Sequence, residues 1–272
     1  MTFKYILQFY TMFLNSDILC ETISEYADEY LLLEWINPDY LNWDLISTKE
    51  TAIHYLLKNV DKIVWRRFCE NPSPLAIELL EYNPDKIDWD VLSANPAAIH
   101  LLEKNPNRIN WDKLSENPAA ELLLIRNTDK INYASLCKNP AEWIDPFLYD
   151  KNLIDWDNLS SNPSNFAMQM LLRNPDKINW MCLSLNTNPA AIQLLAKNKN
   201  KIFWWFLSTN PAALPLLIQN YKKIDWEGFC ENPSAIQALP KFKDKIDWNR
   251  ISCNSAIFHS NKKIIYDILI EL

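Results

Sequence analysis

Glycine is almost missing from this chain of 272 residues, because Gly228 is the only one. Gly-rich phosphate-binding loops and the nucleophile elbow of hydrolases both need backbone where a side chain does not fit. Both motifs are therefore excluded. The sequence also has no stretch that approaches the roughly 20 apolar residues of a membrane span, so we expect no membrane partner.

Paired cysteines are missing as well. Six cysteines occur without a CxxC pair or a nearby pair of histidines, so no metal site or cofactor is expected. We interpret them as reduced thiols of an intracellular protein. Basic charge is also in deficit: 27 basic against 34 acidic residues give a formal charge of −7, the wrong sign for binding nucleic acid or anionic lipid through bulk electrostatics.

What the chain has instead is a repeat. Ten copies of a unit of 21 to 24 residues align on an aromatic anchor, which accounts for nine of the twelve tryptophans. The position two before the anchor is aliphatic, the third after it is Ile, Leu or Phe, and the fourth after it is Ser or Cys. The anchors are Trp43, Trp65, Trp89, Trp111, Tyr133, Trp156, Trp180, Trp204, Trp226 and Trp248.

These positions predict two short helices per unit. Asp or Asn precedes the anchor in eight units, where its side chain can accept hydrogen bonds from the first turn of a helix that begins at the anchor. Asn recurs six residues after the anchor and is mostly followed by Pro, as in Asn95-Pro96, which is typical of the start of a second helix. A second Asn, such as Asn83, recurs six residues before the next anchor. There we expect a left-handed residue that ends the helix.

Units this small cannot bury their apolar faces alone, so copies must stack. The predicted fold is all-α: an α-solenoid of about ten two-helix repeats over residues 37–258. Residues 1–36 and 259–272 are predicted to be capping helices that shield two open ends. Pro146 falls inside the second helix of the fifth unit, and a bend is therefore expected near residues 141–152.

The consensus xNPxKIxWxxLSxNPxAIxLLxx, over about residues 37–258, resembles the short Asn-Pro/Trp repeats in proteins of amoebal and algal giant DNA viruses. The resemblance implies a viral origin, and the richness in Asn, Ile and Lys fits an AT-rich genome. It implies no catalytic residues and no particular activity.

A basic residue recurs three positions before the anchor and would form a ladder along stacked units. Such a ladder could follow a phosphate backbone, but the alternative, which we favour, is that each charge pairs with the Asp or Asn beside it. The eight basic residues are Lys62, Lys86, Arg108, Lys130, Lys177, Lys201, Lys223 and Lys245.

The Ser/Cys position suggests a nucleophile at Cys69, Cys137 and Cys230. Seven units carry Ser there instead, and none of the three histidines of the chain is placed to activate a thiol. A small residue at a tight contact between helices explains all ten units.

The seventh and eighth units depart from the rule that the positions around the anchor are polar. Met181 and Cys182 replace polar residues in the seventh, and Phe203, Trp205 and Phe206 do so in the eighth. Large apolar side chains at solvent-facing positions are typical of a protein-binding hot spot. The alternative is that they pack under a neighbouring loop shifted by a two-residue insertion at 186–188.

We therefore predict a non-catalytic viral repeat scaffold, located in the host cytoplasm or the virion, which mediates protein–protein interaction with a host or viral partner. The five candidate partner-binding residues are Met181, Cys182, Phe203, Trp205 and Phe206. The alternative is a structural role as a minor capsid or internal virion component. Nucleic acid is an unlikely ligand, and no pair of titratable residues stands outside the repeat in a way that predicts an enzyme.

Overall fold

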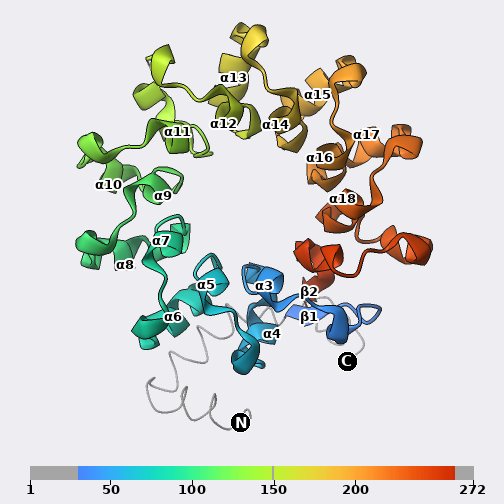
Figure 1. Cartoon of the computed structure of the whole chain (residues 1–272), viewed down its shortest axis with the longest axis horizontal. Helices are drawn as coiled ribbons and strands as arrows, with labels where there is room; N and C mark the ends of the chain where they lie inside the picture. The colour runs from blue at the N-terminus through green and yellow to red at the C-terminus, as the bar shows by residue number, and fades with distance from the viewer. Residues whose placement is uncertain (1–29, 149, 261–272) are drawn as a thin grey trace, which may run out of the picture.

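The chain forms a ring. The computed structural model describes residues 30–260 except residue 149, and this part is mostly helical and repeat-like. Figure 1 shows one short helix of each unit facing the centre and the other helix on the outside. Of the capping helices predicted for residues 1–36 and 259–272, the parts at 1–29 and 261–272 lie outside the described residues.

Nine of the ten inner helices begin at the aromatic anchors, as predicted, and in the tenth unit a 3₁₀ helix begins two residues after the anchor. In all eight units with Asp or Asn before the anchor, that side chain accepts a hydrogen bond from the first turn. These elements are α3 (Trp43–Ile46), α5 (Trp65–Phe68), α7 (Trp89–Leu92), α9 (Trp111–Ser115), α11 (Tyr133–Leu136), α12 (Trp156–Ser161), α14 (Trp180–Leu185), α16 (Trp204–Thr209), α18 (Trp226–Glu231) and the 3₁₀ helix η16 (Arg250–Cys253).

The outer helices are more varied. They are α4 (Ile53–Leu57), α6 (Pro74–Tyr82), α8 (Ile99–Lys104), α10 (Glu121–Ile125), η8 (Glu142–Leu148), α13 (Asn165–Arg173), α15 (Pro189–Lys197), α17 (Leu214–Gln219), η15 (Leu239–Lys245) and η17 (Ser255–Ile257). Pro146 lies inside η8, so the fifth unit has a 3₁₀ helix, as the ninth and tenth units do, where the other seven units have an α-helix. The bend at this unit stays a prediction.

The asparagines that end the outer helices are not left-handed, and that prediction is wrong. No residue of the described chain other than glycine has a positive φ, and Asn83 has φ −127° and ψ 62°. The reason is that the side chain replaces the backbone bond of a left-handed cap. The amide of Asn83 donates to the carbonyl of Leu79 at 2.7 Å, while its own carbonyl accepts from Lys86 N–H at 2.9 Å to start a short 3₁₀ turn.

The buried asparagine six residues after the anchor joins each unit to the one before it. Its Nδ2 donates to two backbone carbonyls of the preceding unit, and its Oδ1 accepts from a backbone N–H two residues later. For Asn117 the acceptors are Ser93 O at 3.1 Å and Asn95 O at 3.0 Å, and the donor is Ala119 N. We call this arrangement the asparagine clamp. Its nine members are Asn71, Asn95, Asn117, Asn139, Asn162, Asn186, Asn210, Asn232 and Asn254.

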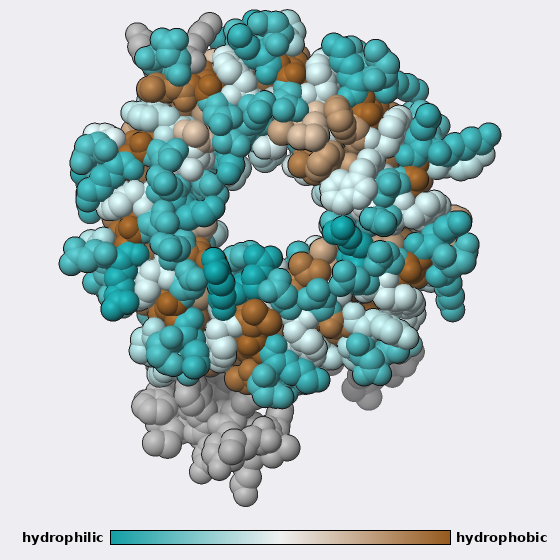
Figure 2. Space-filling view, viewed as in Figure 1, coloured by the Kyte–Doolittle hydropathy of each residue, from teal (hydrophilic) through white to brown (hydrophobic). Residues whose placement is uncertain are grey.

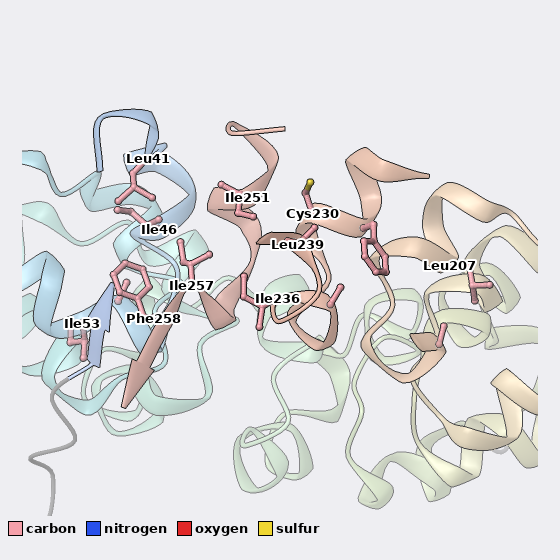
Figure 3. Close-up of a cluster of buried hydrophobic side chains, with 14 of the residues drawn as sticks. Leu41, Ile46, Ile53, Leu207, Cys230, Ile236, Leu239, Ile251, Ile257 and Phe258 are labelled. Carbon is pink, nitrogen blue, oxygen red and sulfur yellow. The ribbon is translucent and has the colours of Figure 1, made fainter. Parts of the chain in front are cut away.

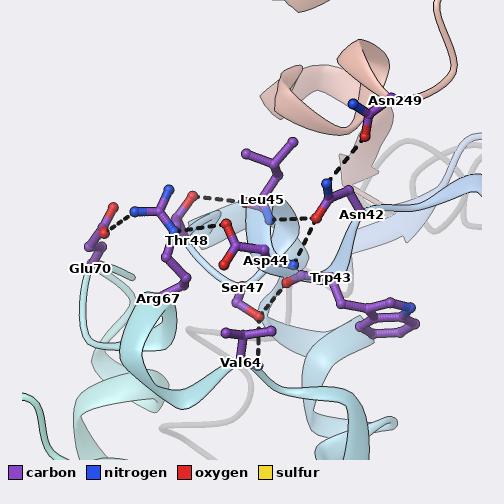
Figure 4. Close-up of polar contacts among 10 residues, drawn as sticks. All are labelled: Asn42, Trp43, Asp44, Leu45, Ser47, Thr48, Val64, Arg67, Glu70 and Asn249. Atoms are coloured by element: carbon purple, nitrogen blue, oxygen red, sulfur yellow. Dashed lines mark hydrogen bonds and ion pairs between the residues drawn. The ribbon is translucent and has the colours of Figure 1, made fainter.

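The Ser/Cys position makes a second link between units. Its side chain is fully buried in all ten units and accepts a hydrogen bond from the N–H before the next anchor. Figure 4 shows Ser47, which accepts from Val64 N at 3.1 Å and donates to Trp43 O at 2.6 Å. The acceptors are Ser47, Cys69, Ser93, Ser115, Cys137, Ser160, Ser184, Ser208, Cys230 and Ser252.

The tenth of these links closes the ring, because Ser252 Oγ accepts from Asn42 N at 2.9 Å. Strand β1 (Tyr30–Leu32) also pairs antiparallel with β2 (Phe258–Ser260), so residues 30–32 and 259–260 of the two predicted capping helices are strands instead. The clamp is interrupted here, since Lys49 occupies its position in the first unit. The chain therefore differs from the open-ended stack that we expected, because a rotation of roughly 36° per unit over ten units completes a circle.

The hydrophobic core continues across this junction. In Figure 3, Leu41, Ile46 and Ile53 of the first unit lie in the same cluster as Ile251, Ile257 and Phe258 at the other end of the repeat. The residue three after the anchor, predicted to be core, is buried in every unit. The first and last units thus bury their apolar faces against each other, as any two neighbours do.

Replacing a clamp asparagine should be costly. Asn117→Ala leaves Ser93 O and Ala119 N–H without their partner in a buried site and removes one of the two donors to Asn95 O, and we expect a loss of about 3 kcal/mol in the free energy of unfolding, measured in urea. Asn107→Ala is the matched control, because Asn107 is exposed on the same repeat, and it should change the value by less than about 0.5 kcal/mol. Equal effects of the two substitutions would contradict the importance of the clamp.

Candidate functional site on the inner rim

The inner rim, which we define as the residues from one before to five after each anchor, carries the net charge of the molecule. It holds 5 basic and 12 acidic residues, a formal charge of −7 that equals the −7 of the whole chain. The acidic residues are Asp44, Glu70, Asp88, Asp90, Asp112, Glu116, Asp155, Asp157, Asp225, Glu227, Glu231 and Asp247. The segments of the seventh and eighth units contain no charged residue.

All five basic residues of the inner rim are held in ion pairs. Arg66 pairs with Asp88 at 3.4 Å, and Arg67 pairs with Asp44 and Glu70 (Figure 4). The remaining pairs are Lys113–Glu116, Lys138–Glu116 and Arg250–Glu231. Since the bases are engaged and fewer than the acids, the surface around the opening is acidic.

An apolar patch interrupts this acidic surface. Three of its side chains are exposed, with 39% of Met181, 39% of Leu185 and 48% of Phe203 accessible to solvent. Figure 2 shows a tan area at the edge of the central opening next to α14 and α16, whereas the rim beside α7, α9 and α11 is mainly teal. Cys182, Trp205 and Phe206 are half-buried and complete the apolar patch.

The repeat register explains why Met181 and Phe203 stand together. The residue before each anchor lies next to the residue after the preceding anchor, as Asn132 Nδ2 and Asp112 Oδ1 do at 2.9 Å. At the junction of the sixth and seventh units, Asn179 Nδ2 and Asp157 Oδ1 form the same pair at 2.9 Å. At the junction of α14 and α16 this polar pair is replaced by Phe203 and Met181.

The other three predicted residues are partly structural. The rings of Trp205 and Phe206 meet edge-on with centroids 4.9 Å apart, and the Arg250 guanidinium lies 5.9 Å from the Trp205 centroid. The insertion at 186–188 does not displace the clamp, because Asn186 keeps its bonds to Ser160 O and Asn162 O. Of the five predicted residues, only Met181 and Phe203 are exposed, whereas Trp205 is half-buried and packs against Phe206.

Leu185 was missed by the sequence analysis. It lies five residues after the anchor, a position that Thr, Glu, Ala, Lys, Ser and Cys fill in the other units. A large aliphatic residue at a position that is elsewhere polar or small is a signal of the kind that identified Met181. Comparing this column of the repeat would have found it.

The only glycine supports the same part of the ring. Gly228 lies in α18, and a Cβ there would come within 2.6 Å of the carbonyl oxygen of Trp205 and 3.2 Å of Ser208 Cβ. Its φ is not positive, so the requirement is for space and not for an unusual backbone. Glycine therefore permits the close approach of α18 to α16.

Seven of the eight residues of the basic ladder have partners within the protein. Four of its members lie over the anchor ring of the preceding unit, with distances from 4.3 to 5.5 Å to the ring centroid, and three others pair with the neighbouring Asp. Those over rings are Lys62, Arg108, Lys130 and Lys201, and those paired with Asp are Lys86, Lys177 and Lys245. The expected pairing with acids therefore accounts for only some of the ladder, and cation–π contacts account for more.

The thiols at the Ser/Cys position are buried in the interface between units. Burial raises the pKa of Cys137 to about 11 and also raises the pKa of Cys69 and Cys230. At neutral pH these groups are thiols that accept weak hydrogen bonds, such as the one from Asp155 N at 3.4 Å to Cys137 Sγ. This environment fits the packing interpretation and not an activated nucleophile.

No protein-family model, curated protein or solved structure matches this chain. Between residues 30 and 260 no helix is long and apolar enough to cross a membrane. The same described part contains no group of three or more His, Cys, Asp or Glu residues that could hold a metal ion.

Gly228→Ala should destabilise the protein, although alanine normally favours a helix interior by about 1 kcal/mol. The added methyl group must push α18 away from α16, and we expect a loss of about 1 to 3 kcal/mol in the free energy of unfolding. The control is Ser135→Ala, two residues after the anchor in the fifth unit, which should be nearly neutral. An unchanged or increased stability of Gly228→Ala would mean that α16 and α18 are not in close contact.

Proposed function

We propose that the chain is a closed α-solenoid of ten units that acts as a non-catalytic scaffold, and that the apolar patch on its inner rim binds a protein partner. We further propose that it comes from a giant DNA virus and acts in the host cytoplasm. The repeat consensus and its resemblance to viral Asn-Pro/Trp repeats support the origin. Support for the binding role comes from the patch.

The observation that carries the proposal is the replacement of a polar pair by Met181 and Phe203. At the equivalent position Asn179 accepts from Met181 N and Cys182 N, while Phe203 makes no such bond to the start of α16. The missing cap lowers the stability of the protein by about 0.5 to 2 kcal/mol. The exposed Phe203 ring and Met181 thioether add no stability to the free protein in return. Residues that reduce stability while exposing apolar surface are typical of a binding site.

The test restores the repeat rule. The double variant Met181→Asp/Phe203→Asn introduces the side chains found at Asp112 and Asn132, so it should fold and melt at or above the temperature of the wild type. We expect affinity capture from host-cell lysate, read by mass spectrometry, to recover a partner with the wild type and to lose it with the variant. That partner, once purified, should bind the wild type directly.

Leu122→Ser is the matched control, because Leu122 is 60% exposed on the outer helix α10. It should retain the partner. If all three proteins recover the same set, the apolar patch does not bind a partner. Recovery of capsid proteins by all three, together with stoichiometric presence in purified particles, would favour the alternative role as a minor capsid or internal virion component.

A further inference from the structure

The apolar patch lies between two acidic borders. On the side of the sixth unit stand Asp155 and Asp157. Burial raises the pKa of the Cys182 thiol, and the negative charges of Asp157 and Asp155 raise it further, because both carboxylates lie near the apolar patch. On the side of the ninth unit stand Asp225 and Glu227. Asp157 is already held by Asn179 through a hydrogen bond to a neutral amide, which leaves its charge uncompensated.

No basic side chain of the inner rim is available to neutralise these borders. Each of the five is already held in an ion pair with an acidic residue of the inner rim, and Arg250 is bound to Glu231 of the ninth unit at 3.1 Å. Glu227 is exposed, and no basic residue of the described part of the chain forms an ion pair with it. A ligand of the apolar patch therefore meets negative charge on both sides.

The opening is wide enough for a helical ligand. Ten inner helices spaced about 9 Å apart lie on a circle with a radius of about 14 Å. After the helix radius of about 5 Å is subtracted, an opening on the order of 18 Å remains, and an α-helix with its side chains needs about 10 to 12 Å. Figure 2 shows this opening free of described side chains.

We propose that the inner rim binds a basic amphipathic helix of a partner protein, whose apolar face covers Met181, Leu185 and Phe203 while its Lys or Arg residues face the acidic borders. This inference rests on the proposed function and specifies its partner. Buried apolar anchors provide the affinity, and complementary charge selects the partner and accelerates its association. The excess of 12 acidic over 5 basic residues repels a phosphate backbone from the same opening.

The probes are three fluorescent peptides of 18 residues. The first places Leu on one face and Lys on the other face of a helix, the second replaces each Lys by Glu, and the third scrambles the first so that no apolar face forms. Binding to the full chain is measured by fluorescence anisotropy at several salt concentrations. We expect the first peptide to bind, with an affinity that falls as salt rises, and the other two to bind at least tenfold more weakly.

Variants of the protein separate the contribution of the apolar patch from that of the acidic borders. Met181→Asp/Phe203→Asn should weaken the first peptide at least tenfold, and Phe203→Asn alone is a second variant in case the double substitution perturbs folding. Glu227→Gln should weaken it about threefold and reduce the salt dependence. Glu121→Gln, at an exposed position of the outer helix α10, is the matched control and should have no effect.

Equal binding of the Lys and Glu peptides, equal binding of the scrambled peptide, or no binding of any peptide would overturn the proposal. The broader function is judged separately by the capture experiment. If the double variant loses a captured partner while the peptides fail to bind, only the basic helical nature of the partner is wrong. If the variant loses no partner, the apolar patch itself is not the site.

Discussion

The buried asparagine clamp is the interaction on which the rest of the structure depends. Inner helices of four to six residues are far too short to be stable in isolation, and their last carbonyls have no partner within the helix. The clamp satisfies two carbonyls of one unit with the amide of the next. For the inner helix that ends near Ser93, the partner is Asn117 of the following unit. Each unit is therefore complete only when its neighbour is folded.

Closure of the ring extends this dependence to the first and last units. The hydrogen bond from Asn42 N to Ser252 Oγ is the same link that the Ser/Cys position makes at the nine other junctions. The pairing of β1 with β2 adds strand hydrogen bonds that occur nowhere else in the described chain. Tyr40 takes the place of the basic ladder residue, with its ring 5.7 Å from that of Trp248. The junction is thus chemically distinct at Lys49 but continuous in its core. A closed ring also turns a repeated inner helix into the wall of an opening, which gives the apolar patch a defined setting.

The sequence predicted what a single unit dictates. The helix start at nine of the ten anchors, the Asp or Asn cap in eight units and the Asn95-Pro96 start of the second helix, which begins as a 3₁₀ turn before α8, follow from local hydrogen bonding and are confirmed. Two roles of asparagine were not predictable in this way. The clamp donates to carbonyls more than 20 residues earlier, and Asn83 reaches back to Leu79 in place of a left-handed turn. Closure was also missed, because it depends on a small rotation that accumulates over ten junctions.

The candidate site was predicted from departures from the repeat, which identify unusual residues but do not show how deeply each of them is buried. Comparing columns identified Met181 and Phe203, which are exposed, but it could not separate them from Trp205 and Phe206, which pack into the wall. That distinction depends on how closely α16 approaches α18 at Gly228, a property of the assembled ring.

Closure of the ring is tested most directly by a disulfide across the strand pair, with Leu31→Cys and His259→Cys in a chain whose Cys20, Cys182 and Cys253 are replaced by serine. Paired antiparallel residues have Cα atoms about 4.5 to 5.5 Å apart, within the range of a disulfide, whereas the ends of an open stack of ten units would be on the order of 90 Å apart. A closed ring predicts a rapid intramolecular disulfide, seen as a monomer of altered mobility on a non-reducing gel. No crosslink, or only crosslinked dimers, would contradict it.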